Sequence, residues 1–501
     1  MPLPEKLLNQ LVRKFKMINL LLIGLGPHAQ RCYLPIFKKY GEKWRVQIAC
    51  GVDLQEKKPI IEDYFSLLGK EIPMFYVPNE QMGKKNLSNP VRKKLEEWVE
   101  KFKIKGVIIA TEPLSHYAYA DWALEKQLSV LLDKPITTNV NVSTSILAAK
   151  KLITDYNQLE EKYLKLKTKN PKIIFSVHVQ RRYHRGINKI RDLIAEVYRK
   201  TNCPLTFIQA AHADGQWRMP NEIIDLTYHG FNYGYGVCSH SGYHLFDTLL
   251  YLLKSAPKKE KEITSVEVIA NFIRPDDLIA QLTYNDYIKI FPDFLKYNNY
   301  SEGEYSKKCK KFGEVDAFIS LIFKSHSKTL SVGMINLFHN SLSQRGWLSC
   351  QGRDLYKGNG RIGHEFYQII QGPFQTIYVN SFKSGGEKGK NIFGPTGEYH
   401  WEIHVFRNKT LFPNWKEYEV ITSKDLKIGG NRGELWGQQL ETRVLCVKEF
   451  VDFLHGKLKR EELKSELPTH RAGVVLLSAA YQSGARQFRG KNQKVEISFS
   501  I

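Results

Sequence analysis

Two short segments of the chain hold residues whose types and spacing could bind a dinucleotide. The first, residues 23–29, reads Ile-Gly-Leu-Gly-Pro-His-Ala and follows an apolar run. A glycine turn between a strand and a helix exposes backbone N–H groups to a pyrophosphate, because no side chain stands in the way. The second, residues 133–135, reads Asp-Lys-Pro and places Lys134 at the end of a later apolar run. Together they predict a dinucleotide cofactor with an ammonium group beside its reactive end.

An acidic residue, Asp53, closes the next apolar run after the glycine turn. Its carboxylate could accept hydrogen bonds from the hydroxyls of an adenosine ribose. The separation from Gly26 exceeds the usual distance of about 20 residues, and the polar stretch 38–45 accounts for the excess. A carboxylate repels a 2′-phosphate, so the sequence predicts NAD rather than NADP. Lys57 and Lys58 could offset that charge, which leaves NADP open.

Oxidation of an alcohol by a nicotinamide needs a C–H bond facing the ring, a base for the hydroxyl proton and a positive group near the oxygen. His244 is the candidate acid–base residue, because imidazole titrates near neutral pH. Lys134 would hydrogen-bond the reacting oxygen and polarise a carbonyl in the reverse direction. Two structural alternatives stay open: Lys134 held in an ion pair, and His244 at a helix start, oriented by Asp247.

His240 precedes His244 by four residues, which places both on one face if the segment is helical. With His229 nearby, this spacing also raises the question of a metal. The sequence around these histidines supplies no evident acidic or cysteine ligand. We therefore expect no metal there and predict that His240 contacts the substrate.

These residues need a scaffold that brings distant segments together, and the apolar runs predict one. Strands are expected at 18–24, 46–53, 106–111 and 129–132, with helices at about 28–40, 56–69, 90–103 and 115–127. This alternation predicts parallel strands with right-handed crossovers and a ligand at their carboxyl ends.

Beyond residue 135 the pattern changes. A long polar helix is expected at 143–169, then a strand at 173–180, a helix at 187–200 and a strand at 205–211. From 265 to about 419 many segments are typical of strands joined by Gly, Pro and Asn turns, which predicts a large, mostly antiparallel sheet. Apolar residues at helical spacing predict two further helices, at about 440–454 and 471–486.

The predicted fold class is α/β: an N-terminal Rossmann domain with a doubly wound parallel sheet, then a larger α+β domain with an open, mostly antiparallel sheet. A chain of 501 residues favours two domains. We expect an N-terminal extension at 1–16, a dinucleotide-binding domain at 17–140, and a substrate and oligomerisation domain at 141–501. Insertions in the latter are expected near 274–312 and 350–435.

Several motifs follow one another in a characteristic order. They are Gly24-x-Gly26-x-x-Ala29, Ala110-Thr111-x-Pro113-x-x-His116, Ala123-Leu124, Asp133-Lys134-Pro135, Arg181-Arg182-Tyr183, Trp217-Arg218, Gly234-x-Gly236, Gly242-x-His244-x-x-Asp247 and the segment 476–483. This order resembles the glucose–fructose oxidoreductase and inositol dehydrogenase family (Gfo/Idh/MocA), from residue 18 to about 495. The family's usual Glu-Lys-Pro is Asp-Lys-Pro here, which keeps the lysine.

The resemblance implies that Lys134 and His244 occupy the family's two usual catalytic positions, and we expect His240 to act beside them. Cofactor contacts are expected from Gly24, Gly26, Pro27, His28, Ala29, Asp53, Thr111, Pro113, His116, Asp133 and Lys134. Substrate contacts are expected from Arg182, Tyr183, Trp217, Arg218, His240 and Asp247. Where the family commonly has Asp-x-Gly-x-His, this chain has His240 in place of the acid.

The overall composition limits the classes of binding partner that the protein is expected to have. A formal net charge of +23 would suit nucleic acid, an anionic membrane or a phosphorylated substrate. The lysines are spread along the chain and interleaved with glutamates at 258–262, which favours a solvated surface and argues against nucleic acid. The longest apolar runs fall short of the roughly 20 residues of a membrane span. Seven cysteines without a Cys-x-x-Cys pair are typical of reduced thiols in the cytoplasm.

The sequence therefore predicts a cytoplasmic NAD(P)-dependent oxidoreductase that acts on a sugar, a polyol or a related alcohol or ketone. We expect a homo-oligomer, since members of the family often pair through the open sheet. Two alternatives stay open. Some members of the family are glycosidases that oxidise and re-reduce the sugar within one turnover. The exchanged acid at His240 and the extra loops also fit a cofactor-binding regulatory or scaffold protein without catalysis.

Overall fold

The computed structural model describes residues 16–69, 71–227, 229–255, 261–348, 360–384, 391–428 and 438–498. The expected N-terminal extension, apart from Lys16, lies outside the described residues, and so do parts of the expected insertion at 350–435. The chain forms two compact units. Unit 1 comprises 1–138, 154–183 and 440–471, and unit 2 comprises 139–153, 184–439 and 472–501. The expected boundary at 140 thus falls near the first crossing, and two later segments return to unit 1.

Unit 1 is built on a six-stranded parallel sheet with the order β3-β2-β1-β4-β5-β6. Its strands are β1 (Ile18–Ile23), β2 (Val46–Leu54), β3 (Met74–Val77), β4 (Ile104–Ile109), β5 (Ser129–Leu132) and β6 (Phe175–Val177). The strand order reverses between β1 and β4, and in such sheets ligands bind beyond the carboxyl ends of the strands at that point. The predicted parallel sheet is confirmed.

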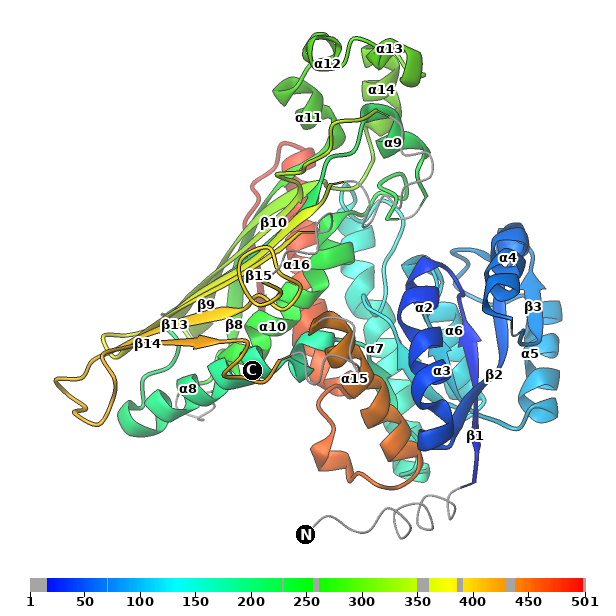
Figure 1. Ribbon diagram of the computed structural model, residues 1–501, viewed down its shortest axis with the longest axis horizontal. Helices are drawn as coiled ribbons and strands as arrows, with labels where there is room; N and C mark the ends of the chain where they lie inside the picture. The colour runs from blue at the N-terminus through cyan, green and yellow to red at the C-terminus, as the bar shows by residue number, and fades with distance from the viewer. Residues whose placement is uncertain are drawn as a thin grey trace. The chain divides into compact units, whose positions relative to one another are not determined.

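Helices connect these strands (Figure 1). They are α2 (Pro27–Arg31), α3 (Tyr33–Trp44), α4 (Lys58–Leu68), α5 (Asn89–Lys101) and α6 (His116–Glu125). Each was predicted within a few residues, although the first predicted helix is divided at Cys32. Strand β3 was not predicted, because it has only four residues and just one of them is buried.

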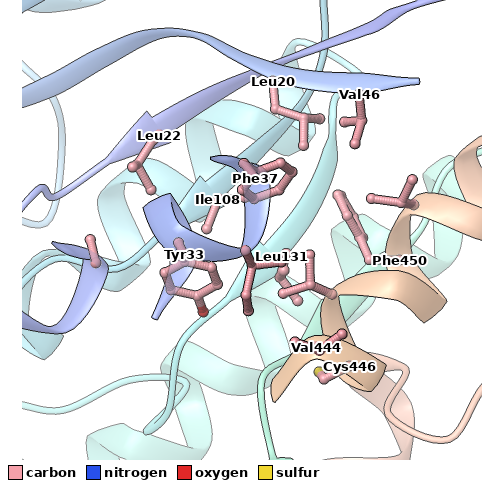
Figure 2. Packing of buried hydrophobic residues seen from close by; sticks show 14 of the residues in the cluster. Leu20, Leu22, Tyr33, Phe37, Val46, Ile108, Leu131, Val444, Cys446 and Phe450 are labelled. Carbon is pink, nitrogen blue, oxygen red and sulfur yellow. The ribbon is translucent and has the colours of Figure 1, made fainter. Parts of the chain in front are cut away.

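The core of unit 1 lies between its sheet and two helices from opposite ends of the chain. Leu20 and Leu131 of the sheet pack with Phe37 of α3 and with Phe450 of α15 (Gln438–Leu454), as Figure 2 shows. The hydrophobic face predicted for the helix at 440–454 therefore covers the parallel sheet. Burial of such side chains is the main stabilising term for this unit.

Unit 2 is built on a nine-stranded sheet with the order β14-β13-β12-β11-β7-β10-β9-β8-β15. Its strands are β7 (Phe207–Gln216), β8 (Ser265–Ile273), β9 (Asp316–Ser325), β10 (Lys328–Asn340), β11 (Ile362–Gln371), β12 (Gln375–Ser384), β13 (Glu402–Arg407), β14 (Tyr418–Thr422) and β15 (Val495–Ser498). All neighbours are antiparallel except β7 and β10. The predicted mostly antiparallel sheet is confirmed.

Helices cover one face of this sheet. The helices of unit 2 include α8 (Arg185–Thr201), α9 (Pro220–Asp225), α10 (Tyr243–Leu253) and most of α16 (Arg471–Phe488), while α7 (Ile146–Lys169) crosses between the units in sequence. Ser483 of α16 accepts the N–H of Ala270 in β8 (2.8 Å), and α10 packs on β7. Buried and exposed residues alternate along the strands, as expected for a sheet with one covered face.

The region 265–419, in which many strands were expected, also contains a helical segment that was not predicted. Residues 275–309 form α11 (Pro275–Gln281), α12 (Tyr284–Ile290), α13 (Phe294–Tyr297) and α14 (Glu302–Cys309) around a small apolar cluster. The local signal was present, because Thr283 with Asp286 and Ser301 with Glu304 form capping boxes. None of the described helices is long and apolar enough to span a membrane.

Candidate cofactor and catalytic site

The glycine turn follows β1 at the carboxyl edge of the parallel sheet. Gly24 has φ +92°, and a Cβ there would lie 2.7 Å from the backbone of Ala110 and Thr111. Its N–H donates to the carbonyl of Val52 at the end of β2 (2.8 Å). A Cβ on Gly26 would meet nothing within 4 Å. Gly24 is therefore required for the turn itself, and Gly26 leaves the backbone open to a ligand such as a pyrophosphate.

Asp53 stands beside this turn. Its Oδ2 accepts the N–H of Leu25 (2.6 Å), and its Oδ1 accepts the N–H of Leu54 (2.7 Å). Burial raises the pKa of Asp53, against the effect of these two hydrogen bonds. Each carboxylate oxygen has a second lone pair, so the side chain can still receive a ribose hydroxyl. Asp53 thus shapes the turn in addition to its expected role.

The loop after β4 is tied to the segment after β5 by His116, a fully buried residue. Its Nδ1 lies 2.7 Å from the carbonyl oxygen of Pro135, and its Nε2 lies 3.2 Å from that of Thr111. Pro113 begins the short helical turn that precedes α6. Glu112 was not singled out from the sequence, and burial raises its pKa to about 8. His116 therefore holds the loops that carry the expected cofactor contacts.

Asp133 and Lys134 directly follow β5, and the Lys134–Pro135 peptide bond is cis. The carboxylate of Asp133 forms an ion pair with His28 of the glycine turn (Oδ2–Nε2 2.9 Å). Burial works against both charges, yet the pair raises the pKa of His28 to about 10 and holds the pKa of Asp133 well below its usual range. This ion pair joins the glycine turn to the strand end that bears Lys134.

Three further side chains surround this ion pair, and none of them was singled out from the sequence. His178 follows β6, is 3% exposed, and has its Nδ1 4.0 Å from Oδ1 of Asp133 and 2.5 Å from the hydroxyl of Tyr33. Cys32 lies with its Sγ 3.7 Å from Nδ1 of His28. Burial lowers the pKa of His178 to about 3, so this imidazole is neutral. Among the described residues, His28, Asp133 and His178 form a group that could hold a metal ion.

Arg182 and Tyr183, which were expected to contact substrate, make contacts within unit 1. The Arg182 guanidinium donates to the carbonyl of Lys464 (2.6 Å) and to Oγ1 of Thr469 (2.7 Å). The Tyr183 hydroxyl donates to Glu449 (2.6 Å). Both side chains thereby hold the C-terminal segment 440–471 in this unit, and contact with substrate stays a prediction.

The expected catalytic histidines lie in unit 2. His240 falls in a π-helical turn, Cys238–Gly242, and half-buried His244 stands in the first turn of α10. His240 is 6% exposed, and its ring stacks on His229 with centroids 4.6 Å apart. Single π turns inside helices occur frequently at functional sites. The segment is helical as the spacing required, but the π turn shifts the register between His240 and His244.

Fully buried Glu314 holds this π turn in place. It accepts the N–H of Cys238 (3.0 Å) and the hydroxyl of Tyr481 in α16 (3.0 Å). A Cβ on Gly236 would lie 1.8 Å from the carbonyl oxygen of Glu314, so only glycine allows this approach. Asp247 is 3% exposed in α10. The motif Gly234-x-Gly236 thus has a structural role that spacing alone did not reveal.

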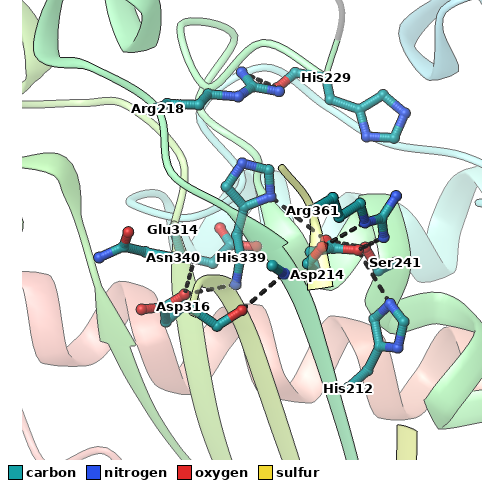
Figure 3. A network of polar contacts seen from close by, with 12 residues as sticks. His212, Asp214, Arg218, His229, Ser241, Glu314, Asp316, His339, Asn340 and Arg361 are labelled. Atoms are coloured by element: carbon teal, nitrogen blue, oxygen red, sulfur yellow. Dashed lines mark hydrogen bonds and ion pairs between the residues drawn. The ribbon is translucent and has the colours of Figure 1, made fainter. Parts of the chain in front are cut away.

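A network of charged side chains centres on Asp214 near the end of β7 (Figure 3). Asp214 accepts hydrogen bonds from Ser241 (2.7 Å) and Arg361 (2.6 Å) and contacts His212 (3.0 Å) and His339 (Nδ1, 3.4 Å). Although burial opposes it, Arg361 holds the pKa of Asp214 well below its usual range. Burial lowers the pKa of His339 to about 4. A carboxylate therefore lies directly beside the residue that follows His240.

Trp217 and Arg218 follow β7. The indole Nε1 of Trp217 donates to the hydroxyl of Tyr287 (3.3 Å), and the ring packs on Phe291, both in or next to α12. Arg218 is 7% exposed and donates to the carbonyl of His229 (3.2 Å). Trp217 thus anchors the helical insertion, while Arg218 lies beside the histidines. Lys134 belongs to unit 1 and His244 to unit 2.

Comparison with known proteins agrees with this geometry. Residues 18–152 match the family model described as oxidoreductase family, NAD-binding Rossmann fold (Gfo/Idh/MocA). This segment therefore matches the NAD-binding domain of that family, which agrees with the family resemblance and with NAD as the predicted cofactor. None of the curated proteins matches the chain.

Solved structures share the fold along almost the entire chain. An oxidoreductase domain protein from Kribbella flavida is 12% identical, with 97% of this chain and 100% of that one covered and a TM-score of 0.60. An inositol dehydrogenase homolog from Azotobacter vinelandii, in complex with NADH and myo-inositol, is 12% identical (97% and 98% covered, TM-score 0.55). The WlbA dehydrogenase from Chromobacterium violaceum, in complex with NADH and UDP-GlcNAcA, is 14% identical (97% and 97%, TM-score 0.55). At these identities the likeness is one of fold.

Proposed function

We propose that this protein is an NAD-dependent dehydrogenase or reductase that acts on a CH–OH group of a sugar, a polyol or a related small alcohol or ketone. The observation that carries the proposal is the His28–Asp133 ion pair of 2.9 Å. It fixes the strand end that bears Lys134 against the glycine turn, so one cofactor can contact both. When bound, NAD supplies the hydride acceptor or donor.

Residues of the chain would bind the cofactor, stabilise charge on the reacting oxygen and transfer the hydroxyl proton. The open backbone at Gly26 would receive the pyrophosphate, and Asp53 the adenosine ribose. The ammonium of Lys134 would donate a hydrogen bond to the reacting oxygen and stabilise its negative charge. His244, half-buried at the start of α10, would take or return the hydroxyl proton. Proton transfer of this kind typically contributes about 10²–10⁴-fold to the rate.

The substrate class has two supports. Solved relatives are in complex with myo-inositol and with UDP-GlcNAcA, which makes polyols and sugars the class to examine first. Within unit 2, Ser241 donates to Asp214 and Arg218 donates to the carbonyl of His229, so donors and acceptors lie beside the segment that bears His240 and His244. Hydroxyl-rich ligands need such a mixture of donors and acceptors.

The test is hydride transfer followed by nicotinamide absorbance, with NAD and with NADP, across a panel of sugars and polyols. Lys134→Ala should lower turnover by at least about 100-fold while the Kd for NAD stays nearly unchanged. Lys126→Ala is the matched control, because Lys126 precedes the same strand and pairs with Glu96 (2.8 Å) on the surface. Undiminished turnover of Lys134→Ala would contradict the proposal.

The same panel separates the alternatives. Release of product from a glycoside without net change in nicotinamide absorbance would indicate a glycosidase that oxidises and re-reduces its substrate. Stoichiometric NAD binding without turnover of any compound would indicate a regulatory or scaffold role.

We also infer that two copies pair through the uncovered face of the nine-stranded sheet. Cross-strand neighbours place Ile269, Met334, Tyr378 and Val420 in one lateral row on the same face. Ile269, Met334 and Val420 are 36–40% exposed, and exposed apolar side chains gathered on one sheet face favour a partner surface. Light scattering should give a dimer or larger assembly for the wild type and a smaller mass for Met334→Lys. Ile290→Lys, at an exposed residue of α12, should leave the mass unchanged.

A cytoplasmic location is part of this proposal. The six cysteines that the structure describes are free, and five of them are buried. Reduced thiols persist where the cell keeps a reducing environment. Fractionation of cells that express the native chain would test the location directly.

A further inference from the structure

Three potential metal ligands converge at the carboxyl edge of the parallel sheet. His28 lies in α2, directly after the glycine turn, while Asp133 directly follows β5 and His178 directly follows β6. One ligand atom from each lies within 4.8 Å of the others. They are separated by up to 150 residues in sequence, and the sheet brings them together because parallel strands end at the same edge. From sequence spacing, a metal site was considered only at His229, His240 and His244.

An ion pair between His28 and Asp133 explains only two of the three. His178 is 3% exposed, and its Nε2 is buried without a hydrogen-bond partner among the described residues. A buried polar group without a partner costs free energy, so such groups are normally satisfied. The other ring nitrogen of His178, Nδ1, lies 4.0 Å from Oδ1 of Asp133, so the imidazole stands close enough to the carboxylate for a cation to complete the group.

We propose that His28, Asp133 and His178 bind a divalent transition-metal ion, with Zn²⁺ as the ion that suits them best. Two imidazoles and one carboxylate are a common ligand set for Zn²⁺, whereas Mg²⁺ and Ca²⁺ favour all-oxygen sites. Three protein ligands leave one tetrahedral position for water or another ligand, as in catalytic rather than structural zinc sites. This proposal does not rest on hydride transfer by the protein.

The surroundings match those of a metal site. The Tyr33 hydroxyl lies 2.5 Å from Nδ1 of His178, and Sγ of Cys32 lies 3.7 Å from Nδ1 of His28. Outer contacts of this kind orient metal-binding imidazoles. The His28 side chain is 28% exposed, which gives the ion a path from solvent. Lys134 is a cation next to the site, so we expect weaker binding than in a four-ligand structural site.

The experiment measures metal binding on the full chain without substrate or turnover. Protein stripped with a chelator is titrated with Co²⁺, and the visible d–d absorption reports the ligand geometry. Equilibrium dialysis against Zn²⁺ with elemental analysis then gives the stoichiometry. The variants are His178→Gln, His28→Gln and Asp133→Asn. His455→Gln is the matched control, because His455 also lies in unit 1 and contacts the carbonyl of Trp44 (2.9 Å).

We expect one ion per chain in the wild type and in His455→Gln, and at least about tenfold weaker binding in each ligand variant. If His178→Gln fails to fold, His28→Gln decides, because His28 is partly exposed. Absence of bound Co²⁺ and Zn²⁺ in the folded wild type would overturn the proposal. Equal binding by the wild type and both histidine variants would overturn it as well, since the ion would then sit elsewhere.

NAD binding measured on the same samples keeps this test separate from the proposed function. Loss of metal in His178→Gln with NAD binding intact would support the metal site, because His178 is not among the expected cofactor contacts. Wild-type protein that binds NAD and turns over sugars but takes up no metal would overturn the metal site alone. Protein that binds metal but turns over nothing would overturn the oxidoreductase proposal alone.

Discussion

The carboxylate of Asp53 accepts the backbone N–H of Leu25 at 2.6 Å. This contact crosses from the end of β2 to the middle of the glycine turn, between residues 28 apart in sequence. It means that one acidic side chain both shapes the cofactor loop and stands where an adenosine ribose is expected. We therefore expect the charge and hydrogen bonding of Asp53 to affect both the affinity for NAD and the choice between NAD and NADP.

Asp53→Asn should weaken NAD binding by about tenfold, which corresponds to about 1.4 kcal/mol. An amide offers one acceptor oxygen, so it cannot serve the N–H groups of both Leu25 and Leu54. Loss of the negative charge should also narrow the preference for NAD over NADP. Calorimetric titration with both nucleotides measures this. Asp63→Asn, at an exposed position of α4, is the control. Equal NAD affinity in the wild type, Asp53→Asn and Asp63→Asn would contradict the prediction.

Alanine substitutions at the two glycines of the turn should affect different properties, namely stability at Gly24 and NAD affinity at Gly26. Gly24→Ala requires a Cβ 2.7 Å from the Ala110 backbone at φ +92°, so we expect a loss of about 2–4 kcal/mol in the free energy of unfolding. Gly26→Ala, with φ −64° and open space around the Cβ, should stay within about 1 kcal/mol of the wild type. Its NAD affinity should nevertheless fall, because the methyl group fills the backbone approach.

Urea unfolding and NAD titration on both glycine variants make the comparison. A stable Gly24→Ala protein, or a Gly26→Ala protein with wild-type NAD affinity, would contradict the assignment of turn and ligand roles.

A buried ion pair should make Arg345 important for the stability of unit 2. Its guanidinium donates two hydrogen bonds to Glu222 (2.6 and 2.7 Å), and the Arg345 side chain is fully buried. Arg345→Met leaves the Glu222 carboxylate without this partner, so the free energy of unfolding should fall by about 3–5 kcal/mol. Adding Glu222→Gln should recover part of that loss.

The control for this pair is Lys296→Met, which removes an exposed pair with Asp293 and should cost less than about 1 kcal/mol. Thermal and urea unfolding of the four proteins give the comparison. Equal stability of Arg345→Met and Lys296→Met would refute the role of the buried pair.

The stability of unit 2 should depend on pH through Asp316. Burial raises its pKa from 3.8 to about 7, although the N–H groups of His339 and Asn340 donate to it. The folded state thus binds this proton more tightly than the unfolded state. Its contribution is fully present below about pH 4 and is lost as the pH rises through 7.

Asp316→Asn removes that titration and keeps an acceptor for both N–H groups. From pH 4 to pH 8, the difference in the free energy of unfolding between Asp316→Asn and the wild type should therefore shift by about 2–4 kcal/mol in favour of Asp316→Asn. Urea unfolding at both pH values measures the change. A constant difference between the two proteins would show that Asp316 titrates normally.

Much of the cofactor half of the site followed from local sequence. A strand, a glycine turn and a helix start are encoded within about 20 residues, because apolar burial, positive φ and helix initiation are local properties. For the same reason, the positions of Asp53 and Lys134 at strand ends could be predicted. Strand β3 escaped notice because its four residues are mostly half-buried.

Other features depended on the tertiary structure. Arg182 and Tyr183 pair with Thr469 and Glu449, which lie 287 and 266 residues away in sequence, and no local pattern indicates such partners. The π turn at His240 depends on Glu314, which follows the helical insertion 275–309 in sequence and accepts the N–H of Cys238. Sequence spacing treated His240 and His244 as neighbours on a regular helix, whereas the turn shifts their register.

Local sequence was enough to predict the parallel sheet, the glycine turn, the lysine at the end of β5 and the open sheet of unit 2, since each rests on periodicity or on one turn. The tertiary structure alone placed His178 beside His28 and Asp133. Strand order decides which strand ends become neighbours, and it depends on the packing of the entire unit. The proposed role of His178, a polar residue after a three-residue strand, therefore depends on the fold and could not be predicted from local sequence.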